Sequence, residues 1–218
     1  MGLTTVLFDL DGTLIDSSPG IRRCADESLV FHGLPPVTDA QFAEFIGPPL
    51  TDSFGLLAPD PSMVPSLIAV YREHYGAGGM YEYTVYDGVP EMLDRLLHMG
   101  LRLGIATSKV GRYARPVVEH AGLGERFAVV SGAESDGPGA AKTVVMGAAI
   151  EALGIDDADT VVMVGDRAHD GLGATALGTR FVGVTWGFGS PDELLDAGAH
   201  VLVSHPGQLD DAIDELRR

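Results

Sequence analysis

The chain has 218 residues, of which 45% are hydrophobic and 21% charged, enough for one large domain or for a domain with a smaller insert. Its 14 basic residues against 31 acidic ones give a formal net charge of −17. This charge speaks against nucleic acid and against an anionic membrane surface as partners. A small anion can still bind where the few cations gather at one site.

The sequence gives no sign of export or of membrane insertion. No stretch reaches the apolar length of a membrane span, and the first residues lack a basic region followed by an apolar run. The single cysteine, Cys24, permits no intramolecular disulfide and is compatible with a reducing compartment. We therefore expect a cytoplasmic protein.

Six short runs rich in apolar and β-branched residues predict strands. They are Thr5–Phe8, Leu101–Ala106, Phe127–Ser131, Thr160–Val164, Arg180–Val184 and His200–Val203. Several are apolar throughout, which is typical of parallel strands buried on both faces. Segments with helical spacing lie between them, such as 89–97 before Gly100 and 144–152 before Gly154. This alternation predicts an α/β fold with a Rossmann-like, doubly wound parallel sheet.

The long gap between the first two predicted strands breaks this alternation. About ninety residues lie between them, which is too long for one crossover helix. The helices predicted in this gap are Pro19–Phe31, Asp39–Phe45, Pro49–Leu57 and Met63–Tyr75. Turn-like segments bound the gap at 16–20 and 86–90. We interpret residues 17–84 as an inserted α-helical domain, and residues 1–16 and 85–218 as the α/β core.

Polar residues follow three of the predicted strands, at the edge of the sheet where ligands of open α/β folds bind. The residues after the first, second and fourth strands are Asp9 and Asp11, then Thr107, Ser108 and Lys109, then Asp166, Arg167 and Asp170. Lys142 begins the helix before the fourth strand, and it and Lys109 are the only two lysines of the chain. Because parallel strands end on one edge, we expect these side chains to converge.

Such a set of side chains suits phosphate chemistry. Neighbouring carboxylates repel one another unless a cation joins them, and Mg²⁺ prefers oxygen ligands. Lysines and hydroxyl groups beside the metal suit a phosphate dianion, and phosphoryl transfer needs a nucleophile, positioning and charge neutralisation. A lone aspartate after a strand is more often a cap or a turn residue, so the prediction depends on the whole set.

The motifs resemble those of the haloacid dehalogenase superfamily. The four matching segments are Asp9-Leu10-Asp11-Gly12-Thr13-Leu14, Gly104-Ile105-Ala106-Thr107, Lys142, and Gly165-Asp166-Arg167-x-x-Asp170. The helical insert resembles the class 1 cap of that superfamily. Further similarity at 46–50, 86–89, 106–109 and 183–189 is to its phosphoglycolate phosphatase and 5′-nucleotidase-like branch. The chain departs from the pattern at Thr143, where relatives often carry proline.

The resemblance implies a catalytic pair and a metal site. Asp9 is expected to be the nucleophile that forms an aspartyl-phosphate. Asp11 is expected to be general acid to the leaving alcohol and then general base to water. The implied ligands of Mg²⁺ are Asp9, the backbone carbonyl of Asp11, and Asp166. Asp170 would support the metal through water or through its direct ligands.

The resemblance also implies a set of phosphate contacts. Thr107 and Lys142 are expected to hold the phosphate, and Lys142 also to offset the charge of Asp9. Ser108 and Lys109 are candidate substrate contacts, although Lys109 is equally compatible with a solvated position. We expect Arg167 to pair with a neighbouring carboxylate rather than with substrate.

The implied activity is hydrolysis of a small phosphorylated metabolite, such as phosphoglycolate, a nucleoside monophosphate or a sugar phosphate. Two alternatives stay open: a sugar phosphomutase of the same superfamily, and a non-catalytic phospho-aspartate signalling or binding module. Asp11 argues against a dehalogenase, and a helical insert without lysine argues against a phosphonatase. Both a monomer and a small homo-oligomer fit the sequence.

Overall fold

The structure is a computed structural model that describes residues 2–135 and 141–217. The chain divides into two compact units. Met1–Ile15 and Val85–Arg218 form the first unit, and Asp16–Thr84 form the second. The residues singled out in the motifs all belong to the first unit, so its sheet is the frame of the site.

The first unit is built on a six-stranded parallel sheet in the order β5-β4-β1-β6-β7-β8. The strands are β1 (Thr5–Phe8), β4 (Arg102–Val110), β5 (Val129–Ala133), β6 (Val161–Gly165), β7 (Arg180–Val184) and β8 (Val201–Val203). The chain builds outward from the central β1 on one side with β4 and β5, and then on the other side with β6, β7 and β8. This confirms the predicted doubly wound sheet, and its order reverses beside β1, where a ligand crevice is expected.

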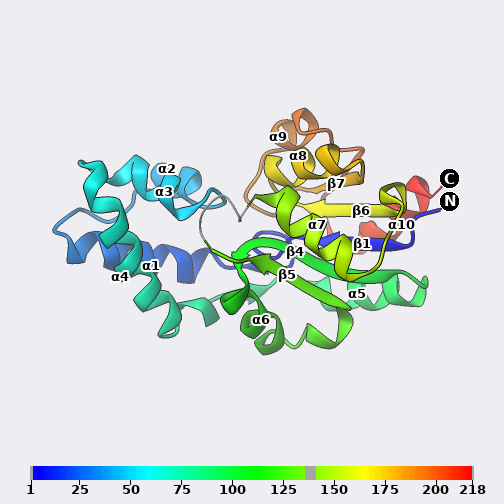
Figure 1. Cartoon of the computed structure of the whole chain (residues 1–218), viewed down its shortest axis with the longest axis horizontal. Coiled ribbons are helices and arrows are strands. Elements are labelled where there is room, and N and C mark those ends of the chain that lie inside the picture. The colour runs from blue at the N-terminus through cyan, green and yellow to red at the C-terminus, as the bar shows by residue number, and fades with distance from the viewer. Residues whose placement is uncertain (1, 136–140, 218) are drawn as a thin grey trace. The chain divides into compact units, whose positions relative to one another are not determined.

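Helices connect these strands along the chain. They are α5 (Val89–His98), α6 (Gly111–His120), α7 (Lys142–Ala152), α8 (Ala168–Leu177), α9 (Pro191–Asp196) and α10 (Leu209–Leu216). All residues of β1 and β6 are buried, so both faces of the sheet are covered. On one face, Met146 of α7 and Ala174 of α8 belong to the same buried cluster as Leu7, Met163 and Phe181 of the strands. Figure 1 shows α7 lying along the sheet.

Helix α5 illustrates how the apolar spacing sets the packing. Val89, Met92, Leu93 and Leu96 are fully buried, because residues three and four apart share one face of a helix. The helix ends just before Gly100, whose φ of +76° lies in the left-handed region that glycine adopts without strain. The spacing and the glycine therefore act together to place this helix against the sheet.

Strand β4 is longer than the sequence indicates. Polar residues after Ala106 predicted its end there, whereas the structure continues the strand to Val110. The pairing with β5 shifts in register between Thr107 and Val110. This irregularity is invisible to a pattern of alternating apolar residues, and it carries the three polar residues 107–109 along the strand end.

Two short strands were not predicted. They are β2 (Ile15–Asp16) and β3 (Thr84–Val85), which form a two-stranded sheet. Each contains one of the two points at which the chain passes from one unit to the other. Two residues are too few to show a period, so the sequence could not reveal them.

The second unit is helical. Its helices are α1 (Ser18–Phe31), α2 (Asp39–Phe45), α3 (Leu50–Leu57) and α4 (Val64–Gly76). Helix α2 begins with a capping box between Thr38 and Gln41, which satisfies free backbone donors of the first turn. The ring of Phe54 lies edge-on to Phe45 and Tyr71, with centroids 5.1 and 5.8 Å apart. Among the described residues, none of the helices has the length and apolar character needed to span a membrane.

Candidate active site

The site begins where β1 ends. Asp9 directly follows Phe8 and is 8% exposed, and its backbone N–H donates to the carbonyl of Val164 at 2.9 Å. Gly12 has a φ of +86°, and a Cβ at this position would lie 2.2 Å from Asp166 Oδ2. Only glycine therefore allows the loop to turn this close to the end of β6.

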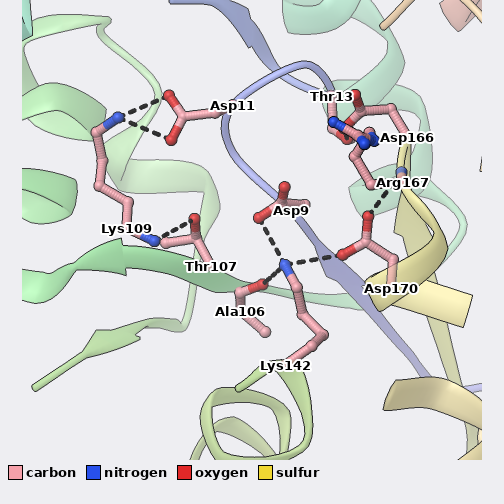
Figure 2. Close-up of polar contacts among 10 residues, drawn as sticks. All are labelled: Asp9, Asp11, Thr13, Ala106, Thr107, Lys109, Lys142, Asp166, Arg167 and Asp170. Atoms are coloured by element: carbon pink, nitrogen blue, oxygen red, sulfur yellow. Dashed lines mark hydrogen bonds and ion pairs between the residues drawn. The ribbon is translucent and has the colours of Figure 1, made fainter. Parts of the chain in front are cut away.

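Lys142 lies among the carboxylates at this edge, with its side chain 3% exposed. Its Nζ donates to Asp9 Oδ1 at 2.7 Å and to the Ala106 carbonyl at 3.0 Å, and lies 2.8 Å from Asp170 Oδ1 (Figure 2). Burial lowers the pKa of Lys142, but the charges of Asp170 and Asp9 outweigh burial and raise that pKa above its ordinary value. Its ammonium group therefore stays charged and cannot act as a base at neutral pH.

Three carboxylates meet around this lysine. Asp9, Asp166 and Asp170, called here the acidic trio, each offer an oxygen within 4.8 Å of the others. Burial raises the pKa of Asp9 and of Asp166, and the nearby charge of Asp170 adds to both shifts. Metal-free, the trio therefore carries an unfavourable concentration of negative charge.

The donor set of the trio fits a hard divalent cation. Asp170 Oδ1 lies 2.8 Å from Lys142 Nζ, and the same ammonium group also contacts Asp9 at 2.7 Å. With all three carboxylates ionised against one ammonium group, the net charge is minus two, which one divalent cation cancels. Closely spaced carboxylate oxygens are also the ligands that such ions prefer.

Asp166 is held from two sides. The Thr13 hydroxyl donates to Asp166 Oδ1 at 3.0 Å and the Phe188 backbone N–H donates to Oδ2 at 2.8 Å. Both bonds favour the charged carboxylate and partly oppose the effect of burial on its pKa. Neither donor was predicted from the sequence, although Thr13 stands in the first motif. Phe188 stands in the 183–189 run, but a backbone amide leaves no signature in residue type.

Asp11 lies outside the trio and pairs with the second lysine. Lys109 Nζ donates to both carboxylate oxygens at 2.7 Å, with side chains 6% exposed for Lys109 and 20% for Asp11. Figure 2 shows Asp11 directed toward Lys109, and Asp9 toward Lys142. The structure therefore brings Lys109 into the site and places it on Asp11, a contact that sequence reasoning did not foresee.

The remaining candidates lie at the ends of β4 and β6. Thr107 is 1% exposed, and its hydroxyl accepts the backbone N–H of Lys109 at 3.2 Å. Ser108 is half-buried and, among the described residues, hydrogen-bonds to none of the other candidates. Arg167 pairs with Glu193 at 2.9 Å, which confirms the expected pairing with a carboxylate. The Arg167 backbone N–H also donates to Asp170 Oδ2 at 3.1 Å.

The fold and the site together define a class of hydrolase. A doubly wound sheet presents Asp9 from β1, Thr107 from β4 and Asp166 from β6 at one edge, as expected from the parallel arrangement of the strands. The family model described as "Haloacid dehalogenase-like hydrolase" matches residues 6–184. The chain therefore belongs to the haloacid dehalogenase-like hydrolase family, which confirms the family predicted from the sequence.

Individual relatives cover nearly the whole chain. A 5′-nucleotidase of Pseudomonas aeruginosa is 38% identical over 87% of this chain and 86% of its own length. The tyrosine-protein kinase PtkA of Mycobacterium tuberculosis is 36% identical over 97% of this chain and 70% of its own. The crystal structure of a predicted phosphatase from Clostridium acetobutylicum has a TM-score of 0.91 and 36% identity, covering 99% of this chain and all of its own.

Proposed function

We propose that the protein is a Mg²⁺-dependent phosphatase that hydrolyses a small phosphomonoester through an aspartyl-phosphate on Asp9. The observation that carries this proposal is the 2.7 Å contact between Asp9 and the buried Lys142 within the acidic trio. The lysine offsets the charge of the nucleophile and offers a cation to the incoming phosphate. The 5′-nucleotidase among the relatives and the predicted phosphatase among the solved structures support the reaction class.

In this proposal, the metal would be held by Asp9, by Asp166 and by the backbone carbonyl of Asp11, with Asp170 in support. When bound, Mg²⁺ supplies positive charge to the phosphate oxygens and to the trio. Thr107 and Lys142 contribute a hydroxyl and an ammonium group to the same oxygens. The helical second unit acts as a cap that admits substrate and excludes water. We expect the enzyme to work in the cytoplasm.

The reaction has two steps. In the first, a carboxylate oxygen of Asp9 attacks phosphorus, the bond between phosphorus and the ester oxygen breaks, and Asp11 gives its proton to the leaving alcohol. In the second, water attacks phosphorus, Asp11 takes the proton of that water, and the bond between phosphorus and Asp9 breaks. Inorganic phosphate leaves, and both carboxyl groups return to their starting states.

The first test is phosphate release from a panel of phosphoglycolate, nucleoside monophosphates and sugar phosphates in the presence of Mg²⁺. Asp9→Asn keeps the shape of the side chain, and we expect it to lower turnover by about 10⁴-fold or more. Asp210→Asn is the matched control, because Asp210 pairs with Arg95 at 3.0 Å and takes no part in the proposed reaction. Comparable activity in wild type and Asp9→Asn would overturn the assignment of the nucleophile.

The second test addresses the metal. We expect dialysis against a chelator to abolish phosphate release and Mg²⁺ to restore it, because the trio needs a cation to accept a further anion. A radiolabelled substrate phosphate should remain on wild-type protein after rapid quenching and be released by hydroxylamine. Full activity in the chelator, or label on Asp9→Asn, contradicts the proposal.

The alternatives give different results with the same reagents. A phosphomutase would convert one sugar phosphate into its isomer, and a signalling module would take up the label without turning over. The relative named as a tyrosine kinase is the reason to add ATP with a tyrosine-containing protein substrate to the panel. Net phosphate release from an ester, with no isomer formed and no phosphate transferred from ATP to the protein substrate, distinguishes the phosphatase.

A further inference from the structure

The run 183–189 is similar to relatives but has no role in the reaction steps above. Strand β7 ends at Val184, and the segment that follows, residues 185–189, is called here the 185–189 loop. It is fixed at both ends: the Thr185 N–H donates to the Val203 carbonyl of β8 at 2.9 Å. At the other end, Ser190 caps helix α9 by accepting the N–H of Glu193. The loop is therefore a tethered connection between two elements of the core.

The middle of the loop is tied to the first motif. The Trp186 indole Nε1–H donates to the Thr13 carbonyl at 3.0 Å. The hydroxyl of the same threonine donates to Asp166 Oδ1. Trp186 thus connects the loop to the residue that contacts Asp166 from one side, and Phe188 reaches Asp166 from the other through its N–H at 2.8 Å.

Glycines let the loop approach this closely. A Cβ on Gly187 would lie 2.3 Å from the Gly12 carbonyl oxygen and 2.4 Å from Asp166 Cβ. A Cβ on Gly189 would lie 2.0 Å from the Asp166 carbonyl oxygen. All three distances are far below van der Waals contact, and each involves backbone or the fully buried side chain of Asp166. The loop can deliver the Phe188 amide only because these two positions lack a side chain.

We propose that the 185–189 loop is a positioning element for Asp166 that sets the affinity of the acidic trio for its metal, by holding that carboxylate between the Phe188 amide and the Thr13 hydroxyl. This inference rests on the proposed function, since it assigns the loop to the metal of that site. Groups that orient a metal ligand through hydrogen bonds typically change metal affinity or activity by about 10- to 100-fold when they are removed.

The decisive experiment is calorimetric titration of Mg²⁺ into wild type, Gly187→Ala and Gly147→Ala. Gly147 lies on α7, and a Cβ there meets nothing within 4 Å, so it is a matched glycine-to-alanine control. We expect Gly187→Ala to weaken Mg²⁺ binding by about 10- to 100-fold, and Gly147→Ala to leave it unchanged. Mg²⁺ binding by Gly187→Ala within twofold of wild type would overturn the inference.

Phosphate release at different Mg²⁺ concentrations distinguishes a loss of metal affinity from a general loss of active-site structure. The three atoms nearest to a Cβ on Gly187 belong to Gly12 and Asp166, not to Lys142 or Asp9. We therefore expect kcat of Gly187→Ala to return close to the wild-type value at saturating Mg²⁺, with only the required Mg²⁺ concentration raised. A kcat that stays low at every Mg²⁺ concentration, with unchanged metal affinity, contradicts the inference.

A second variant keeps the inference testable if Gly187→Ala fails to fold. Trp186→Phe retains an aromatic ring, although a smaller one, and removes the donor to the Thr13 carbonyl, so we expect Mg²⁺ affinity to fall by several-fold. Unchanged affinity in a folded Trp186→Phe protein would then overturn the inference. A wild-type protein that binds no Mg²⁺ at all overturns the proposed metal itself, whereas equal binding by wild type and variants overturns only the role of the loop.

Discussion

The two lysines of the chain both pair with a carboxylate of the loop after β1, but in different surroundings. The side chain of Lys142 is 3% exposed and contacts Asp9 and Asp170 inside the acidic trio. The side chain of Lys109 is 6% exposed and contacts both oxygens of Asp11, whose own side chain is 20% exposed. A lysine–aspartate pair therefore occurs twice, once inside a buried cluster of carboxylates and once at the more solvated margin of that cluster.

The different surroundings of the two lysines indicate different roles. Lys142 is the cation shared by several buried carboxylates, so the charge of the whole trio depends on it. Lys109 contacts both oxygens of one carboxylate. It therefore mainly fixes the direction of that carboxylate and does not neutralise the charge of several carboxylates. In the proposed reaction, Lys142 contacts the phosphate and the nucleophile Asp9, and Lys109 orients Asp11, which transfers the proton.

Lys142→Met is expected to have the largest effect on stability and on phosphate release. Removing one partner of a buried pair leaves uncompensated charge and typically costs about 3–5 kcal/mol of folding free energy. We expect phosphate release to fall by at least about 10³-fold, since a positioned charge at the phosphate is lost. Urea unfolding in a chelator and a phosphate assay at saturating Mg²⁺ measure the two effects. Lys142→Arg is the control that keeps the charge, and a Met variant as stable as wild type contradicts the role of Lys142.

Lys109→Met is expected to show its effect through the leaving group. Without Lys109 the Asp11 carboxyl loses its fixed direction, and proton transfer to an alcohol slows by about 10²-fold. Hydrolysis of p-nitrophenyl phosphate, whose leaving group needs little protonation, should slow much less. The ratio of kcat/KM for an alkyl phosphate and for p-nitrophenyl phosphate measures this effect. Equal slowing of both esters would show that Lys109 does not act through Asp11.

The sequence predicted which residues lie at the same edge of the sheet, but not which pairs of them form hydrogen bonds or ion pairs. Parallel strands end on one edge, so Asp9, Thr107 and Asp166 were expected to converge, and the structure places them there. The partner of Lys109 depends on the extension of β4 to Val110 and on its register shift. Neither is visible in a pattern of apolar residues, because both arise from pairing with a neighbouring strand.

The helices of the second unit were easier to predict than the contacts of the site. Helix α2 has the predicted bounds, Asp39–Phe45, because a capping box and apolar spacing are local signals. The support of Asp166 by the Phe188 amide is a contact over 22 residues of chain that uses no side chain of Phe188. Local signals fix elements, whereas backbone donors across the sheet edge become visible only in three dimensions.

Asp166→Asn tests the cost of crowding in the trio through its pH dependence. Burial and the charges of Asp170 and Asp9 hold the pKa of Asp166 well above its usual value of 3.8. The folded, metal-free protein then binds more protons than the unfolded chain. The contribution of Asp166 to the free energy of unfolding is therefore greatest below pH 3.8 and is lost as pH rises through the raised pKa. We expect Asp166→Asn to remove part of this fall and to make the chelated protein more stable than wild type at pH 7. Urea unfolding across pH 4–8 in a chelator measures it, and parallel curves for both proteins contradict it.

Arg95→Ala extends the comparison to an ion pair at the surface and should have the smallest effect. Arg95 pairs with Asp210 at 3.0 Å, with side chains 39% and 27% exposed, and also donates to the Pro206 carbonyl. Because solvent screens such a pair, we expect a loss of about 1 kcal/mol or less and no change in phosphate release. Urea unfolding of Arg95→Ala beside the two lysine variants then orders three ion pairs by their exposure. A loss as large as that of Lys142→Met would show that burial does not decide what each pair contributes, and the distinction drawn between the two lysines would lose its physical basis.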